Sequence, residues 1–254
     1  MATTRKTILI TGASSGLGEG MARLFAAKGR DLALCARRVE RLEALKAELL
    51  QRHPGIRISV KALDVNDHEQ VFAVFHAFAQ ELGGLDRIIV NAGLGKGQPL
   101  GSGYFFKANK LTAETNFVAA VAQVEAAMEI FRAQKRGHLV AVSSMSAMRG
   151  LPGNVTTYAA TKAGLTALAE GLRAEMIKRR LPIVVTTLHP GFIETELSSS
   201  SKKTPFMVDT DTGCRAMVAA IEREPAQACV PAWPWRLIGF VMRHAPLGFI
   251  ARSF

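Results

Sequence analysis

Short runs of apolar and β-branched residues alternate along the chain with longer segments in which apolar residues recur every three or four positions. Runs of the first kind are typical of strands, and segments of the second kind are typical of amphipathic helices. Strands are expected at Thr7–Thr11, Asp31–Ala36, Arg57–Ala62, Asp86–Val90, His138–Ser143, Ile183–Leu188 and Gln227–Val230. Helices are expected at Gly16–Lys28, Arg38–Gln51, Asp67–Leu82, Thr112–Gln134, Thr156–Arg180 and Asp209–Arg223.

Strands that alternate with helices are joined by right-handed crossovers, which make the strands parallel and put a layer of helices on each face of the sheet. Several strand segments are apolar at consecutive positions, as expected where both faces of a strand are buried. The sequence therefore predicts an α/β fold, a doubly wound parallel sheet flanked by helices. A chain of 254 residues can form this fold as a single domain. We assign residues 1–232 to this domain and residues 233–254 to an apolar, basic C-terminal tail.

A glycine-rich turn, Thr11–Gly18, joins the first strand to the first helix. Glycine lets the backbone turn sharply and approach a phosphate closely, and the helix start adds unpaired N–H groups and a positive dipole end. The spacing Gly-x-x-x-Gly-x-Gly departs from the common Gly-x-Gly-x-x-Gly, and such a turn on its own is also compatible with binding nothing. Its position between an N-terminal strand and helix favours a dinucleotide site formed by Gly12, Ser14, Ser15, Gly16, Leu17 and Gly18.

The end of the second strand predicts which dinucleotide binds. Enzymes that use NAD usually carry an acidic residue here, which accepts a hydrogen bond from the ribose 2′-hydroxyl. This chain has Arg37 and Arg38 instead, and its first acidic residue, Glu40, lies inside the next helix. Because a guanidinium matches the charge of a 2′-phosphate, we expect NADP(H), with Arg37 as the main contact and Arg38 or Ser14 assisting. The alternative is that both arginines are ordinary surface residues.

Tyr158 and Lys162 are four residues apart in a predicted helix, which places both side chains on one face. A free tyrosine has a pKa of about 10, too high for a proton donor and acceptor near neutral pH. A nearby ammonium lowers the pKa of the phenol, and the same lysine is able to bind a nicotinamide ribose. In isolation, this spacing is equally typical of a half-buried tyrosine beside a surface lysine.

Further polar residues follow the ends of the neighbouring strands. In a parallel sheet these carboxyl ends meet at one edge, where ligands bind. Asn91-Ala92-Gly93 follows the fourth strand and forms a natural wall for a cofactor. Ser143-Ser144 ends the fifth strand, where a hydroxyl is placed to donate to a substrate carbonyl. The turn His189–Thr195 follows the sixth strand and is placed to contact the nicotinamide amide. Asn116 lies early in the long helix predicted from Thr112.

Together these motifs resemble the NAD(P)-dependent short-chain dehydrogenase/reductase family, whose sheet is of the Rossmann type. The resemblance extends from Thr7 to about Val230 and includes Asp64-Val65 after the third strand. It implies an oxidoreductase that transfers a hydride between NADP(H) and a carbonyl or secondary alcohol. It further implies a catalytic tetrad of Asn116, Ser144, Tyr158 and Lys162, and additional cofactor contacts from Asp64, Val65, Asn91, Ala92, Gly93, Tyr158, Lys162, Pro190, Gly191, Ile193 and Thr195.

The family gives each member of the tetrad a role. Tyr158 is implied to be the acid and base, and Lys162 to tune its pKa and bind the ribose. Ser144 is implied to orient the carbonyl, Asn116 to hold a water in a proton relay, and Asp64 to contact the adenine. Tyr158 stands one residue further from Ser144 than is usual in the family, which an extra residue near Gly153–Thr157 would explain. Ser143 and Ser146 remain alternatives to Ser144.

Charge and cysteine content limit the other function classes. The formal net charge of +11 favours anionic ligands, but the basic residues are spread along the chain and form no recognised nucleic-acid module. Cys35, Cys214 and Cys229 are widely spaced and suggest neither a metal site nor a disulfide framework. No signal-peptide core precedes the first strand. We therefore expect a cytoplasmic protein that binds neither metal nor nucleic acid, and the family resemblance implies a homo-oligomer.

The tail mixes aromatic, aliphatic and basic residues and contains no Asp or Glu from Pro225 onward. This pattern is typical of a segment at a membrane interface, but also of a tail that packs over the substrate cleft or a neighbouring subunit. The family resemblance implies that the segment Ser198–Val208, which includes a serine-rich run, lies over the substrate. Both segments favour a hydrophobic carbonyl substrate, such as a ketone, a 3-oxoacyl chain or a lipid-like compound. The alternative function is a non-catalytic NADP(H)-binding regulator or a membrane-surface protein.

Overall fold

Seven strands form one parallel sheet in the order β3-β2-β1-β4-β5-β6-β7. We derived this architecture from a computed structural model, which describes residues 4–95, 97–101, 103, 106–195 and 205–253. The strands are β1 Thr7–Thr11, β2 Asp31–Ala36, β3 Ile58–Ala62, β4 Arg87–Val90, β5 Gly137–Val142, β6 Ile183–Pro190 and β7 Gln227–Val230. From β1 the chain adds β2 and β3 toward one edge of the sheet and then β4 to β7 toward the other edge. The sheet is therefore doubly wound, as the alternation of strands and helices predicts.

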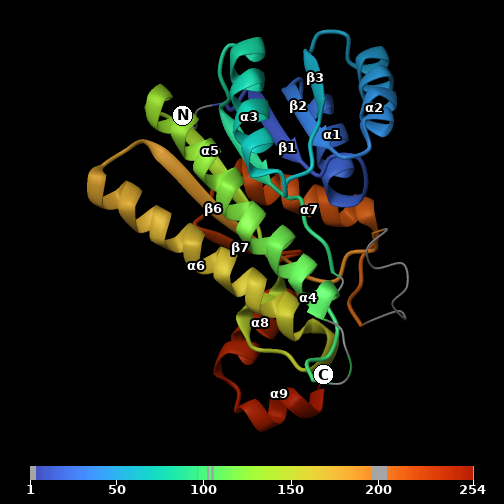
Figure 1. Cartoon of the computed structure of the whole chain (residues 1–254), viewed down its shortest axis with the longest axis vertical. Coiled ribbons are helices and arrows are strands. Elements are labelled where there is room, and N and C mark those ends of the chain that lie inside the picture. The colour runs from blue at the N-terminus through green and yellow to red at the C-terminus, as the bar shows by residue number, and fades with distance from the viewer. Residues whose placement is uncertain (1–3, 96, 102, 104–105, 196–204, 254) are drawn as a thin grey trace.

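Helices cover both faces of the sheet (Figure 1). They are α1 Gly16–Ala27, α2 Val39–Arg52, α3 His68–Leu82, α4 Phe106–Ala113, α5 Ala119–Gln134, α6 Thr156–Arg179, α7 Thr210–Glu222, α8 Trp235–His244 and α9 Leu247–Ser253. Apolar side chains of α3, α5 and α6 pack on one face, and those of α1, α2 and α7 pack on the other. The fully buried strands between them are therefore apolar on both sides, which explains their uninterrupted apolar runs.

Most helix boundaries lie within a residue or two of the predicted ones. Asp67 and Asp209 cap α3 and α7, since their carboxylates accept hydrogen bonds from Gln70 N and Thr212 N. The predicted start at Thr112 is wrong, because helical structure already begins at Phe106. The α-helical hydrogen bonding is then interrupted by a π-helical turn, Glu114–Val118, before α5 continues. This turn contains Asn116.

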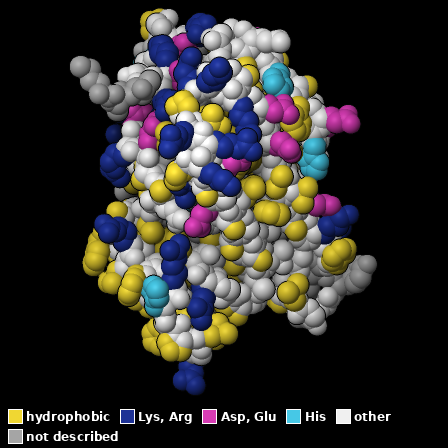
Figure 2. Space-filling view, turned by 90° about the vertical axis from the view of Figure 1, so that its left-hand side faces the viewer, with side chains coloured by type: hydrophobic (Ala, Val, Ile, Leu, Met, Phe, Trp, Pro, Cys, Tyr) yellow, Lys and Arg dark blue, Asp and Glu magenta, His cyan; other side chains and the backbone are white. Residues whose placement is uncertain are grey.

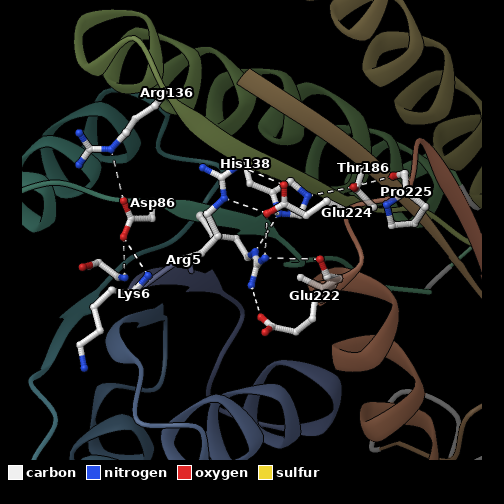
Figure 3. A network of polar contacts seen from close by, with 12 residues as sticks. Arg5, Lys6, Asp86, Arg136, His138, Thr186, Glu222, Glu224 and Pro225 are labelled. Carbon is white, nitrogen blue, oxygen red and sulfur yellow. Dashed lines mark hydrogen bonds and ion pairs between the residues drawn. The ribbon is translucent and has the colours of Figure 1, made fainter. Parts of the chain in front are cut away.

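A buried ionic network ties together the end of the sheet where the strands begin (Figure 3). Arg87 of β4 is 1% exposed, and its guanidinium contacts Glu222 Oε1 at 2.6 Å and Glu224 Oε1 at 3.2 Å. The same guanidinium donates from Nε to His138 Nδ1 at 2.8 Å, and Arg5 pairs with Glu224 at 2.8 Å. Because each buried charge has a partner, this edge holds β4, β5 and the end of α7 in place without an uncompensated charge.

The apolar, basic C-terminal tail forms the helices α8 and α9. Both helices lie at the end of the molecule where the strands terminate (Figure 1). Trp235, Met242 and Ile250 are buried against Met145, Leu151 and Ala159, which forms a third and smaller core. Within the described residues, no helix is both long and apolar enough to cross a lipid bilayer.

Candidate active site

The glycine turn brings the start of α1 into close contact with the loop that follows β4. Gly12 and Gly16 have φ values of +67° and +55°, a region that side chains other than glycine rarely adopt. A Cβ on Gly18 would lie 2.3 Å from the Gly12 carbonyl oxygen, so no larger residue fits there. Ser15 precedes α1 without capping it through its side chain, which leaves the first N–H groups of the helix for another acceptor. The turn therefore fits a dinucleotide phosphate.

Thr11, the last residue of β1, fixes the neighbouring wall. Its hydroxyl accepts hydrogen bonds from Asn91 N at 3.0 Å and Ala92 N at 3.1 Å. The Asn91 side chain returns a hydrogen bond from Nδ2 to the Thr11 carbonyl oxygen at 2.9 Å. Asn91–Gly93 is thus held beside the glycine turn, as predicted for a cofactor wall.

The two arginines after β2 occupy different positions. Arg38 is half-buried and donates from Nη2 to Ser15 Oγ at 2.6 Å and from Nε to Ser14 Oγ at 3.4 Å. Arg37 is exposed. The structure therefore places Arg38 directly on the glycine turn and leaves the Arg37 side chain at the surface next to it.

Asp64 and Val65 follow β3 at the same edge of the sheet. Asp64 Oδ1 accepts from the backbone N and the side-chain Nδ2 of Asn66, both at 3.0 Å, and Val65 is buried. Asn66 Oδ1 in turn accepts from Thr115 Oγ1 at 3.2 Å. These contacts join the loop after β3 to the π-helical turn that carries Asn116.

Ser144 and Tyr158 meet on the other side of β4. Ser144 directly follows β5, and its hydroxyl lies close to the Tyr158 phenol. Burial raises the pKa of Tyr158 above its ordinary value, and the Ser144 hydroxyl acts in the opposite direction. In this structure burial outweighs the expected lowering of the Tyr158 pKa, and the Lys162 amine lies over the ring at 5.9 Å from its centroid.

The structure distinguishes the three serines after β5. Ser143 Oγ donates to the Lys162 carbonyl oxygen at 2.9 Å and also contacts Thr166 Oγ1 at 2.9 Å, so its hydroxyl is directed at α6. Ser146 donates from its backbone N to Ser144 Oγ at 3.1 Å. Ser144 is thus the serine whose hydroxyl reaches Tyr158. The chain between them makes a 3₁₀ turn at Gly153–Val155, at the position where the extra residue was expected.

Lys162 lies on α6 one turn after Tyr158 and is 5% exposed. Its Nζ donates to the carbonyl oxygen of Val142, the last residue of β5, at 2.9 Å. Burial lowers the pKa of this amine to about 8, because an ammonium is poorly solvated there. The side chain points toward Gly93, where an added Cβ would lie 3.5 Å from Lys162 Nζ.

Asn116 is 1% exposed and is held by the loop after β4. Its Oδ1 accepts from Leu94 N at 2.8 Å, and its Nδ2 donates to the Leu94 carbonyl oxygen at 2.7 Å. An added Cβ on Gly93 would lie 3.1 Å from Asn116 Oδ1. Gly93 therefore lies between Asn116 and Lys162. The four predicted catalytic residues all lie at the same end of the sheet.

The turn after β6 is covered by the C-terminal segment. Pro190 ends β6, and Ile193 bridges to Val208. An added Cβ on Gly191 would lie 2.1 Å from the Trp235 ring, and Phe192 meets the same ring edge-on at a centroid distance of 5.2 Å. Thr195 lies near Gly16, with 3.5 Å between its Cβ and a Cβ added there. The turn predicted to contact nicotinamide thus lies between the glycine turn and α8. Residues 198–204, the larger part of the predicted substrate segment Ser198–Val208, lie outside the described residues.

Three residues near the site make contacts that were not predicted from the sequence. Thr11 organises the wall after β4, His189 contacts the Ser144 carbonyl oxygen at 3.3 Å, and Trp235 covers Gly191. The indole nitrogen of Trp235 is buried and has no hydrogen-bond partner among the described residues. Thr11 and His189 end strands of a parallel sheet, and that position is the signal that would have identified them. The contact of Trp235 has no local signal.

Known proteins match this chain over most of its length. Residues 6–205 match the family described as short chain dehydrogenase. An "uncharacterized oxidoreductase" of Mycobacterium tuberculosis is 60% identical over 232 residues, which cover 91% of this chain and 90% of the relative. The alcohol dehydrogenase of the archaeon Thermococcus sibiricus, solved with 5-hydroxy-NADP, is 26% identical with a TM-score of 0.76, covering 88% of this chain and 95% of that one.

A second solved structure shows how far the fold extends. A short-chain dehydrogenase/reductase of Burkholderia phymatum, solved with NAD, has a TM-score of 0.84 at 20% identity and covers 99% of this chain and 97% of its own. At this identity the similarity concerns the fold alone. The family match, the near relative and the shared fold agree with the motifs at the strand ends. The chain therefore belongs to the short-chain dehydrogenase/reductase family and is an oxidoreductase.

Proposed function

We propose that the protein is an NADP(H)-dependent reductase of a hydrophobic ketone or related carbonyl compound. One observation carries the proposal: a serine hydroxyl, Ser144, lies close enough to the Tyr158 phenol to lower its pKa, with the buried amine of Lys162 one helical turn away. A hydroxyl pair of this kind offers two hydrogen-bond donors to a single carbonyl oxygen. A protein that only bound the dinucleotide would not need it.

In the proposed reaction the bound nicotinamide supplies the hydride, which adds to the carbonyl carbon. Tyr158 donates its phenolic proton to the carbonyl oxygen, and Ser144 holds that oxygen by a hydrogen bond. The high pKa of the buried phenol keeps it protonated before reduction. Lys162, as an ammonium, stabilises the phenolate that remains and binds the nicotinamide ribose. Asn116 orients water for the return of the proton to Tyr158.

The preference for NADP(H) rests on charge at the end of β2. Arg37 and Arg38 stand where an acidic residue would bind the 2′-hydroxyl of NAD, and Arg38 already lies on the hydroxyls of Ser14 and Ser15. We propose that Arg37 and Arg38 together bind the 2′-phosphate. The related alcohol dehydrogenase of Thermococcus sibiricus, whose structure was solved with 5-hydroxy-NADP, supports this choice of cofactor.

The apolar character of the substrate is supported by the residues around Ser144. Met145 follows Ser144 directly and packs with Leu151 and Trp235 in the small core beneath α8. Met148 packs against the same core. Side chains of this kind favour an apolar chain or ring next to the reacting carbonyl. The three free thiols support a reducing, cytoplasmic setting, and the long helices α5 and α6 are the surfaces proposed for subunit pairing.

The test is cofactor oxidation by the purified protein with NADPH and NADH side by side. The substrates are ketones and 3-oxoacyl thioesters of increasing chain length. We expect turnover with NADPH that improves with chain length, and no turnover in Tyr158→Phe. Turnover with NADH alone would overturn the assignment of the arginines but leave the enzyme. Tight NADPH binding without turnover on any of these substrates would favour the alternative of a binding-only regulator.

A further inference from the structure

The two sides of α8 differ in what they contact. Trp235, Gly239 and Met242 are buried and face the protein. Leu237 and Phe240 on the other side are 54% and 63% exposed. Leu247 at the start of α9 is 60% exposed. Together with Trp233, which precedes α8 and is also exposed, they form an apolar surface at α8 and α9 that no part of the described chain covers.

Positive charge is interspersed with this surface. Arg236, Arg243 and Arg252 are exposed on the same two helices, and His244 stacks against Phe240. From Pro225 to the C-terminus the sequence contains no Asp or Glu. In Figure 2 yellow and dark-blue side chains are mixed at the lower end of the molecule, and no magenta is visible there. The surface is therefore largely apolar, and the charged side chains within it are all basic.

We propose that this surface of α8 and α9 docks on an anionic lipid bilayer. Aromatic and aliphatic side chains enter the headgroup region, and arginines bind the acidic headgroups around them. The charge pattern disfavours a second copy of the chain as the occupant. A two-fold dimer would bring this surface against itself, so its arginines would face each other with no acidic residue of the segment between them.

The position of the surface connects it to the site. Trp235 packs on Gly191, and an added Cβ on Gly239 would lie 2.9 Å from Cε of Met145, the residue after Ser144. The helix whose outer side meets lipid thus has its inner side on the walls of the site. This arrangement suits a carbonyl substrate that resides in the bilayer. That last point rests on the proposed function, whereas the docking itself does not.

Vesicle sedimentation tests the docking with the full chain. The probes are vesicles of phosphatidylcholine alone and of phosphatidylcholine with an equal share of phosphatidylglycerol. One variant carries Leu237→Ser and Phe240→Ser, and a second carries Arg236→Glu and Arg252→Glu. A charge-matched control carries Lys28→Glu and Arg52→Glu, two exposed basic residues outside α8, α9 and the proposed pairing helices. Melting temperatures establish that each variant is folded.

We expect the wild type to bind the phosphatidylglycerol vesicles, and its binding to fall with added salt. The vesicle affinity of each test variant should be lower than that of the wild type by about tenfold or more. The control should bind as the wild type does. Equal binding by wild type and test variants would overturn the proposal. Absence of vesicle binding by the wild type would also overturn it. This holds whether or not Leu237→Ser and Phe240→Ser dissociate an oligomer, as measured by sedimentation velocity. NADPH oxidation with a water-soluble ketone, measured on the same samples, reports separately on the proposed function.

Discussion

Ser144 lies close enough to the phenol of Tyr158 to lower its pKa, whereas its neighbour Ser143 donates to the backbone of α6. The two adjacent serines thus form a matched pair for mutation. Ser144→Ala should lower kcat/KM for carbonyl reduction by about two to three orders of magnitude, because a donor to the developing oxyanion is lost. The measurement is steady-state NADPH oxidation over a range of substrate concentrations that reaches saturation.

Ser143→Ala is the control. Its buried hydrogen bonds are structural, so we expect a loss of about 1 kcal/mol in the free energy of unfolding and a much smaller loss of kcat/KM. Equal losses of kcat/KM in the two variants would contradict the assignment of Ser144. A larger loss in Ser143→Ala would reverse it.

The pH dependence of reduction should follow Lys162. Burial lowers the pKa of its amine to about 8, so in the free enzyme the ammonium is present below this pH and is lost above it. Since kcat/KM reports the protonation of the free enzyme, it should fall as the pH rises through about 8. A pH–rate profile measures the midpoint of this fall.

Lys162→Arg distinguishes this cause from others. A guanidinium keeps its charge throughout the accessible range, so the fall near pH 8 should disappear even if the overall rate is lower. The same fall in Lys162→Arg as in the wild type would mean that another group titrates. Tyr158 would not be that group in the free enzyme, because burial raises its pKa above the ordinary value for tyrosine.

Arg37 and Arg38 should differ in what they contribute to cofactor choice. Arg38 contacts Ser14 and Ser15 before any cofactor is bound, whereas Arg37 is exposed. We expect Arg37→Ala and Arg38→Ala each to raise the KM for NADPH by about 10- to 100-fold, the value of a hydrogen bond to a charged group. The KM for NADH should change little in Arg37→Ala. An unchanged ratio of NADPH to NADH preference in that variant would refute the role of Arg37.

Arg52→Ala is a suitable control for these two variants. Arg52 lies at the far end of α2 and pairs with Glu48 at 3.1 Å, one turn earlier on the same helix. The substitution Arg52→Ala removes one positive charge from the same helix without affecting the glycine turn. A comparable effect on the NADPH KM would show that overall charge, rather than a direct contact, governs cofactor affinity.

The sequence predicted those parts of the fold and site that depend on local pattern. The strand ends, the glycine turn and the spacing of Tyr158 and Lys162 are all readable within a few residues, and strand order then brings them together. The start of α4 at Phe106 was missed, because this segment follows a glycine-rich loop and shows only a weak apolar periodicity. The cover of Trp235 on Gly191 was also missed, because it joins residues far apart in the chain.

The stability of the fold at mildly acidic pH should depend on His138. Arg87 Nε donates to His138 Nδ1, so the ring is neutral with its proton on Nε2, which donates to Thr186 Oγ1 at 2.9 Å. Thr186 in turn donates to the Pro225 carbonyl oxygen at 2.7 Å. Burial and the neighbouring charges of Arg87 and Arg5 hold the pKa of His138 well below its ordinary value.

The sign of the effect follows from proton binding. Below about pH 6.5 the unfolded chain binds a proton at His138 and the folded chain does not, so the free energy of unfolding falls as the pH falls. The contribution of this one group is about 1.4 kcal/mol per pH unit until the folded-state pKa is reached. Urea unfolding at several pH values between about 5 and 8 measures the slope.

His138→Gln offers a test, because a glutamine amide is able to accept from Arg87 and donate to Thr186 without titrating. We expect this variant to be less stable than the wild type near pH 8 and to lose less stability as the pH falls, so that the two curves converge. His189 is also buried with a lowered pKa and keeps its own share of the slope in both proteins. Parallel curves would show that His138 takes up its proton equally in the folded and unfolded chain, and that Arg87 does not enforce its neutral form.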